Sequence, residues 1–122
     1  MANKKILVVD DEKELLELVK LRLEPSGYSI ITASDGLEGL EKAKTERPDL
    51  IILDLMLPKM NGYEVCRLLK FDIEYKKIPI ILFTARASDE DQATGIKSGA
   101  DAYVVKPFNS KILLEKIKEL IK

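Results

Sequence analysis

Three aspartates at the ends of two apolar runs are the residues whose types and spacing could do chemistry. Asp10 and Asp11 directly follow the apolar run at residues 6–9, and Asp54 directly follows the run at 50–53. Such runs, bounded by polar residues, are typical of strands buried on both faces of a parallel sheet. Parallel strands end at one shared edge, where open α/β sheets hold their ligands. Three carboxylates gathered there repel one another unless a cation lies between them, so the sequence predicts a divalent-metal site with one aspartate free to react.

The elements that must position these aspartates alternate five times between strand and helix. Apolar runs and turn residues predict strands at about 5–9, 28–32, 50–53, 79–83 and 102–105, and helices at about 12–23, 36–46, 63–72, 88–98 and 110–121. With right-handed crossovers, this pattern predicts an α/β fold, a doubly wound five-stranded parallel sheet of order 2-1-3-4-5, flavodoxin-like (βα)5. The whole chain, 1–122, is expected to be one domain. The first and third strands are neighbours in this order, so the aspartates should meet.

The predicted helix ends leave one alternative open for the first aspartate pair. Asp11 with Glu14 could form a helix cap and its capping-box partner, in competition with metal binding. Asp10 has no such alternative role. Later in the chain, Gly99 is expected to adopt a left-handed conformation and to end the fourth helix.

Composition excludes several classes of function. The chain is 46% hydrophobic and 34% charged, with a net charge of −1 and no basic stripe, so no direct nucleic-acid binding is expected. No apolar run is long enough to cross a membrane, and no signal peptide is visible. The single Cys66 cannot form an internal disulfide, which favours a cytoplasmic location. With no histidine, the chain has no histidine ligand, base or phosphohistidine.

Five short blocks of the sequence resemble the signature blocks of bacterial response-regulator receiver domains of the chemotaxis-regulator type. In order along the chain, they are Val8-Val9-Asp10-Asp11-Glu12, Leu53-Asp54-Leu55-Met56-Leu57-Pro58, Met60-Asn61-Gly62, Phe83-Thr84-Ala85 and Val105-Lys106-Pro107-Phe108. The resemblance implies two-component signal transduction, in which a histidine kinase or phosphotransfer protein donates a phosphoryl group to one aspartate. The domain then changes shape to control an output, without turning over a separate substrate.

The resemblance implies that Asp54 is the phosphoacceptor and that Mg²⁺ is the cofactor. A carboxylate can form such a covalent intermediate, although Asp54 alone could also be a loop acid or helix cap. The implied metal ligands are Asp10, Asp11 and Asp54, together with the backbone carbonyl of Met56. A hard cation with carboxylate ligands and retained waters suits phosphoryl chemistry.

The resemblance also assigns roles around the phosphoryl group. Thr84 should hydrogen-bond one phosphoryl oxygen and Lys106 should pair with another, with Lys106–Pro107 as a cis bond and Ala85 small enough to leave room. Tyr103 stands where the family carries its switch aromatic, and would turn inward when Thr84 is drawn toward the phosphoryl group. A strand aromatic that simply packs is the alternative for Tyr103.

Two pairs of residues bear on the lifetime of the aspartyl phosphate and on the docking of the kinase. Met56 and Arg86, two residues past Asp54 and Thr84, are not water-positioning groups, so slow self-dephosphorylation is expected. The first helix has more apolar residues than one buried face requires, and Leu15 and Leu18 are the extra ones. They either contribute to a kinase-docking surface or simply cover the sheet. The fourth helix, fifth strand and fifth helix should form the output surface, where phosphorylation could also promote dimerisation.

Other functions remain possible from the sequence. A Mg²⁺-dependent phosphatase of the haloacid-dehalogenase type would carry a second aspartate at the place of Met56. A flavin- or nucleotide-binding module would want a Gly-, Ser- or Thr-rich loop after the first strand, where this chain is acidic. A phosphorylation-independent protein-binding platform also remains open, and the chain could be a stand-alone regulator or one part of a longer protein.

Overall fold

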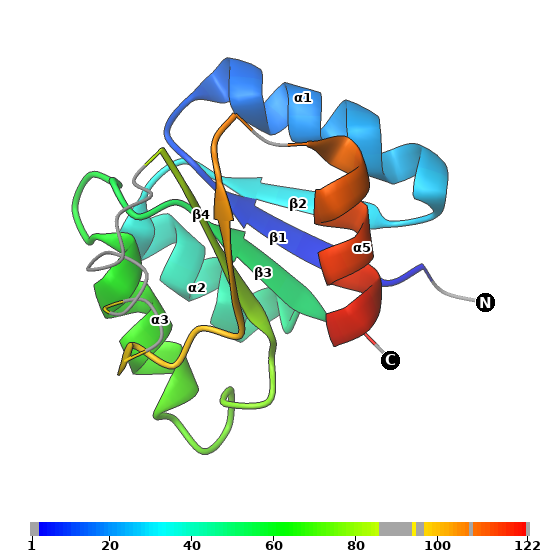
Figure 1. The fold of residues 1–122 in the computed structure, drawn as a ribbon. Helices are drawn as coiled ribbons and strands as arrows, with labels where there is room; N and C mark the ends of the chain where they lie inside the picture. The colour runs from blue at the N-terminus through cyan, green and yellow to red at the C-terminus, as the bar shows by residue number, and fades with distance from the viewer. Residues whose placement is uncertain (1–2, 86–93, 95–96, 108, 122) are drawn as a thin grey trace.

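The computed structural model describes residues 3–85, 94, 97–107 and 109–121 of the chain. Strands and helices alternate along it (Figure 1). The strands are β1 (Lys5–Val9), β2 (Ser29–Ala33), β3 (Leu50–Leu53), β4 (Ile80–Thr84) and β5 (Ala102–Val105). The helices are α1 (Lys13–Leu23), the short 3-10 turn η1 (Glu24–Ser26), α2 (Gly36–Glu46), α3 (Gly62–Lys70) and α5 (Ser110–Leu120).

All neighbouring strands pair in parallel, in the order β2-β1-β3-β4-β5, which confirms the predicted fold. β2 and β4 each lie one residue later than predicted. The parallel register sets these starts: the first pair of β1 and β2 is Lys5 with Ser29, and the first pair of β3 and β4 is Ile51 with Ile80.

α3 is the helix whose end differs most from the prediction, because it stops at Lys70 rather than Asp72. The Asp72 side chain accepts a hydrogen bond at 2.8 Å from the backbone N–H of Glu74. Aspartate side chains that bond nearby backbone in this way favour turns over continued helix.

The sheet has one apolar core on each face. α1 and α5 cover one face, and α2 and α3 cover the other (Figure 1). Alternate residues of β1 enter opposite cores, as the two-residue period of a strand requires: Ile6 and Val8 face α1, whereas Leu7 and Val9 face α2. α1 contributes Leu16, Val19 and Leu23 to this core, a buried stripe with helical spacing.

Most of the predicted fourth helix lies outside the described residues. Thr94 and Lys97 are helical, and Gly99 has φ +94°, the left-handed conformation expected where that helix stops. Among the residues that the structure describes, no helix has the length and apolar character needed to span a bilayer.

Candidate phosphoacceptor and metal site

Two central strands end side by side, and this brings two of the aspartates together. Val9 pairs with Leu53 across β1 and β3, so Asp10 and Asp54 each follow the same rung of the ladder. The Asp54 N–H donates to the Val9 carbonyl at 3.0 Å, and the Asp10 N–H donates to the Ala33 carbonyl at 3.0 Å. Sheet hydrogen bonds therefore hold both residues at the carboxyl edge, where the strand order reverses.

Asp10, Asp11 and Asp54 form a compact carboxylate cluster. One oxygen of each lies within 4.8 Å of those of the other two. Asp10 and Asp54 are buried, at 1% and 5% exposed, whereas Asp11 is exposed. Mg²⁺ takes hard oxygen ligands at about 2.0–2.1 Å and keeps several waters. The donor set therefore fits a magnesium ion held by carboxylates, with the exposed side open to water.

Lys106 supplies positive charge to this cluster from the end of β5. Its Nζ donates to Asp10 Oδ2 at 2.8 Å and lies 3.5 Å from Asp54 Oδ2 and 3.4 Å from Glu12 Oε1. Its side chain is 14% exposed, and the Lys106–Pro107 peptide bond is cis, as the resemblance implied. The amine thus lies within reach of any group attached to Asp54.

The charges at the site shift two pKa values. Burial raises the pKa of the Asp54 carboxyl above its ordinary value, and the Asp10 carboxylate raises it further, against the opposing effects of Lys106 and the Met56 N–H. For Lys106, burial lowers the pKa, but the hydrogen bond to Asp10 and the surrounding carboxylates outweigh it and leave the pKa raised. The three clustered carboxylates outnumber the one ammonium beside them, so the cluster holds more negative charge than Lys106 neutralises, which favours binding of a cation.

The ends of β4 and β5 place the other predicted site residues. Thr84 is 1% exposed, and its carbonyl accepts a hydrogen bond at 2.7 Å from the N–H of Lys106. Ala85 is exposed just beyond it. Tyr103 is partly buried, lies opposite Leu82 in the sheet and packs against the core on the α2 and α3 face.

Two residues were expected to influence the lifetime of the aspartyl phosphate, and one of them, Met56, lies among the described residues. The Met56 side chain is 62% exposed, and its backbone N–H points at Asp54 Oδ1 from 3.4 Å. Arg86 lies outside the described residues.

Two glycines hold the loop that presents Asp54 close to the rest of the site. A side chain at Gly62 would collide with the carbonyl oxygen of Asp54, and the Gly62 N–H donates to the Leu55 carbonyl at 3.0 Å. A side chain at Gly36 would likewise collide with the carbonyl of Met60. Gly62 was included in the Met60-Asn61-Gly62 block, but sequence reasoning missed the close approach at Gly36, for which a glycine directly after the helix cap Asp35 was the available signal.

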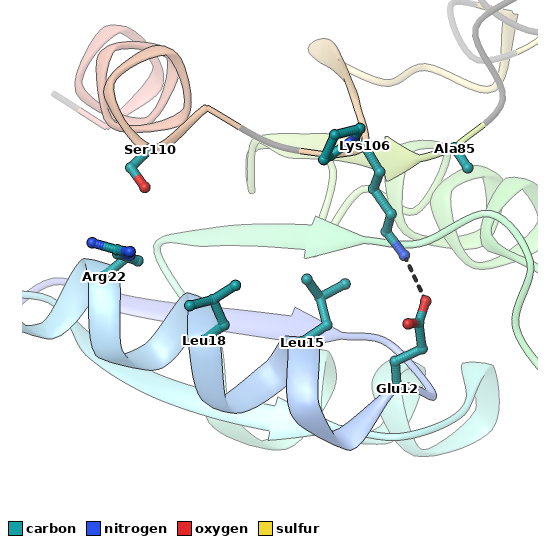
Figure 2. Close-up of a pocket in the computed structure, with 8 residues that line it drawn as sticks. Glu12, Leu15, Leu18, Arg22, Ala85, Lys106 and Ser110 are labelled. Carbon is teal, nitrogen blue, oxygen red and sulfur yellow. Dashed lines mark hydrogen bonds and ion pairs between the residues drawn. The ribbon is translucent and has the colours of Figure 1, made fainter.

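A surface hollow of about 430 Å³ opens beside the cluster (Figure 2). It lies between α1 and the segment after β5, and its lining residues are Glu12, Leu15, Leu18, Arg22, Ala85, Lys106, Pro107 and Ser110. The Leu15 side chain is partly buried and that of Leu18 is 39% exposed, and both point into this hollow in Figure 2. Both leucines thus line the same hollow as Lys106, and Leu15 also packs against the core on the α1 and α5 face.

The start of α1 corrects the predicted cap. Asp11 does not cap the helix: the N-cap residue is Glu12, with no side-chain cap bond, because α1 begins only at Lys13. Asp10, for which no such role was predicted, accepts the Glu12 backbone N–H on Oδ1 at 2.9 Å. Asp10 therefore orders the start of α1 with one oxygen and holds Lys106 with the other.

Comparison with known proteins identifies the family. Residues 6–118 match the family model of the response regulator receiver domain. The chain belongs to this family. It is 48% identical over 120 residues to the alkaline phosphatase synthesis transcriptional regulatory protein PhoP of Bacillus subtilis, a match that covers 98% of this chain and 49% of that protein. The receiver chain thus spans about half the length of the curated relatives it matches.

Solved structures show the same receiver fold. The chemotaxis response regulator CheY4 of Vibrio cholerae is 36% identical, with a TM-score of 0.90 over 97% of this chain and 98% of that chain. A BeF3-activated DrrB receiver domain is 38% identical, with a TM-score of 0.87 over 97% of both chains. The chain is therefore a receiver domain of the two-component response-regulator kind.

Proposed function

We propose that Asp54 accepts a phosphoryl group from the phosphohistidine of a partner histidine kinase or phosphotransfer protein. In this step a bond forms between an Asp54 carboxylate oxygen and phosphorus, the bond from phosphorus to the histidine nitrogen breaks, and the imidazole keeps the electron pair. The observation that carries the proposal is a buried aspartate at the sheet edge, clustered with two further carboxylates and 3.5 Å from a lysine amine.

The proposed cofactor is Mg²⁺, held by Asp10, Asp11 and Asp54 and by the backbone carbonyl of Met56. Bound there, the ion neutralises charge on the transferring phosphoryl group. Support comes from the three carboxylate oxygens, which lie within 4.8 Å of one another on two adjacent strand ends.

Thr84 and Lys106 are proposed to contact the phosphoryl oxygens. Lys106 reaches toward Asp54 from β5, and Thr84 is buried at the end of the adjacent β4, on the same edge of the sheet. Such fixed donors stabilise charge that develops during transfer. Ala85 would leave room for the group at the exposed rim of the site.

The output is proposed to follow from rearrangement of Thr84 and Tyr103. Their strands are directly paired, so a shift of Thr84 toward the phosphoryl group would alter the packing of Tyr103 and with it β5 and α5, to whose surface the fourth helix is expected to contribute. That surface would control an attached output domain or a separate protein, and it could also dimerise. We propose that Leu15 and Leu18, beside the site, contact the kinase.

The receiver is expected to act in the cytoplasm and to turn over no separate substrate. The buried, unpaired thiol of Cys66 supports a reducing location. Against a phosphatase, the position two residues past Asp54 carries the exposed thioether of Met56, which cannot serve as a proton donor or base.

Phosphorylation with a small donor tests the proposal. The protein and its Asp54→Asn variant are incubated with Mg²⁺ and acetyl phosphate, and their intact masses are measured. A single phosphoryl adduct on the wild type and none on the variant, with loss of labelling when EDTA removes Mg²⁺, is the expected result. Equal labelling of both proteins would refute Asp54 as acceptor, and multiple turnover would indicate a phosphatase. The decay of the adduct after donor removal measures the expected slow self-dephosphorylation.

A further inference from the structure

Glu12 is the charged residue of the site to which neither the resemblance nor the proposed reaction gives a role. It is the N-cap residue of α1, yet its side chain makes no cap bond. Its carboxylate instead reaches Lys106, with Oε1 3.4 Å from Nζ. Figure 2 shows this side chain extending from the start of α1 toward Lys106, at one end of the row of residues that line the hollow.

The backbone of Glu12 is held in place, whereas its carboxylate is exposed to solvent. Asp10 Oδ1 accepts the Glu12 N–H at 2.9 Å, which ties the residue to the carboxylate cluster. The side chain is 66% exposed, in contrast with 2% for Asp10 and 6% for Asp54. Glu12 is therefore the exposed member of the three carboxylates within 3.5 Å of the Lys106 amine, and Asp10 and Asp54 are the buried ones.

This arrangement adds an exposed negative charge beside the acceptor's lysine, since the Lys106 amine lies 3.4 Å from Glu12 and 3.5 Å from Asp54. With one divalent cation bound, the four carboxylates of Asp10, Asp11, Asp54 and Glu12 still exceed the positive charge of the ion and Lys106 by one. A small phosphodonor is itself an anion and must enter from the exposed side. Unit charges a few ångströms apart near a protein surface interact by several times the thermal energy.

We propose that Glu12 is an electrostatic gate that disfavours free, highly charged phosphodonors at Asp54. It is thus a specificity-determining residue, and the inference rests on the proposed phosphoryl transfer. A docked protein donor covers the exposed side of the site and brings its own side chains, so its phosphohistidine avoids this repulsion. A free metabolite such as acetyl phosphate has no such side chains and meets the full repulsion. The step gated is the one in which the Asp54–phosphorus bond forms, the acyl oxygen–phosphorus bond breaks and acetate leaves.

A charge series at position 12 tests the gate. Initial rates of phosphorylation by acetyl phosphate are measured by intact mass at saturating Mg²⁺, for wild type, Glu12→Asp, Glu12→Gln and Glu12→Lys. The neutral variant should raise the rate constant per donor concentration by roughly three- to tenfold at low salt, through electrostatic steering of the anion. Glu12→Lys should exceed it, and Glu12→Asp should stay near wild type. Glu17→Gln is the matched control, because it removes an exposed glutamate of α1 that does not line the hollow.

Two further measurements separate a gate from a structural role. At about 1 M salt, where charges are screened beyond ~3 Å, the acceleration should largely disappear. With phosphoramidate, which carries less negative charge than acetyl phosphate, it should be smaller at every salt concentration. Thermal unfolding checks that each variant is folded.

The outcomes distinguish the inference from the function on which it depends. If the wild type is labelled but Glu12→Gln is labelled no faster, the gate is refuted and the phosphoacceptor role stands. An acceleration that depends neither on salt nor on donor charge would also refute the gate, because it would show that Glu12 acts only by holding Lys106. If the wild type is not labelled at all, the proposed function fails and the gate fails with it.

Discussion

Replacing Gly62 by alanine should destabilise the receiver and slow its phosphorylation, although helix propensity predicts the opposite. Gly62 is the first residue of α3, where alanine would be favoured over glycine by up to about 1 kcal/mol. The structure leaves no room for a methyl group there. The new Cβ would collide with the Asp54 carbonyl oxygen and lie 2.8 Å from Leu55 Cα. Both contacts are with backbone, so they cannot be relieved by rotating a side chain.

The size of the effect follows from the displacement needed. Restoring ordinary contact distances of about 3.5 Å requires the loop to move by roughly 1 Å. Overpacking of this kind costs about 1–3 kcal/mol, and a clash with backbone belongs at the upper end of that range. After the helix-propensity gain is subtracted, we expect a net loss of about 2 kcal/mol. For 122 residues, at about 2.1 cal/mol/K per residue, this lowers Tm by about 8 °C. Because the displaced backbone carries Asp54, a misplacement of this size should also slow phosphorylation by about ten- to a hundredfold.

Calorimetry and acetyl phosphate labelling of the same preparations provide the test. The matched control is Gly27→Ala, at a glycine with φ +94° and nothing within 4 Å of the new Cβ. That variant should lose about 1–2 kcal/mol through backbone strain alone, and its labelling rate should equal that of the wild type. A Gly62→Ala protein that melts at or above the wild-type temperature and is labelled at the wild-type rate would refute the reasoning.

Three further predictions concern the charges and the thiol. At 100 times its Kd, Mg²⁺ should add about 2.7 kcal/mol to the free energy of unfolding. Calorimetry should show a rise in Tm of about 10 °C, and this rise should vanish in the Asp10→Asn, Asp11→Asn double variant. Lys106→Ala removes the ammonium 2.8 Å from Asp10, so titration calorimetry should show several-fold tighter Mg²⁺ binding while phosphorylation slows. Burial raises the pKa of the Cys66 thiol to about 12, so a thiol reagent should label it only as fast as the chain unfolds; rapid labelling of the native protein would contradict this.

The strands and their order were predictable because the signal is local and repeated. Each buried strand is a short apolar run that ends at a polar residue, and the right-handed crossover rule leaves few ways to order five of them. Val9 and Leu53 could therefore be placed at the ends of neighbouring strands before any coordinates. The meeting of Asp10 with Asp54 follows directly from that pairing.

The start of α1 was not predictable because it depends on a single residue of register. Asp10, Asp11 and Glu12 are all acceptable near a helix start, and the sequence does not say which of them leaves the strand last. In the structure, sheet bonding to Ala33 holds Asp10 at the strand end, and α1 begins only at Lys13. The contact of Glu12 with Lys106 joins residues 94 positions apart, so no local pattern could have indicated it.

The position of Lys106 offers a physical route from chemistry to output. In the resting receiver, its amine bonds Asp10 at 2.8 Å and lies farther from Asp54, at 3.5 Å. A phosphoryl group on Asp54 would carry about −1.5 to −2 charges in place of one, which shifts the attraction on the amine from Asp10 toward Asp54. The Lys106 N–H is bonded to the Thr84 carbonyl, so this shift acts at the point where β4 and β5 end together. A ligand moves an equilibrium only through differential interaction with its two states, and this change of ion-pair partner would supply the differential interaction that the proposed switch requires.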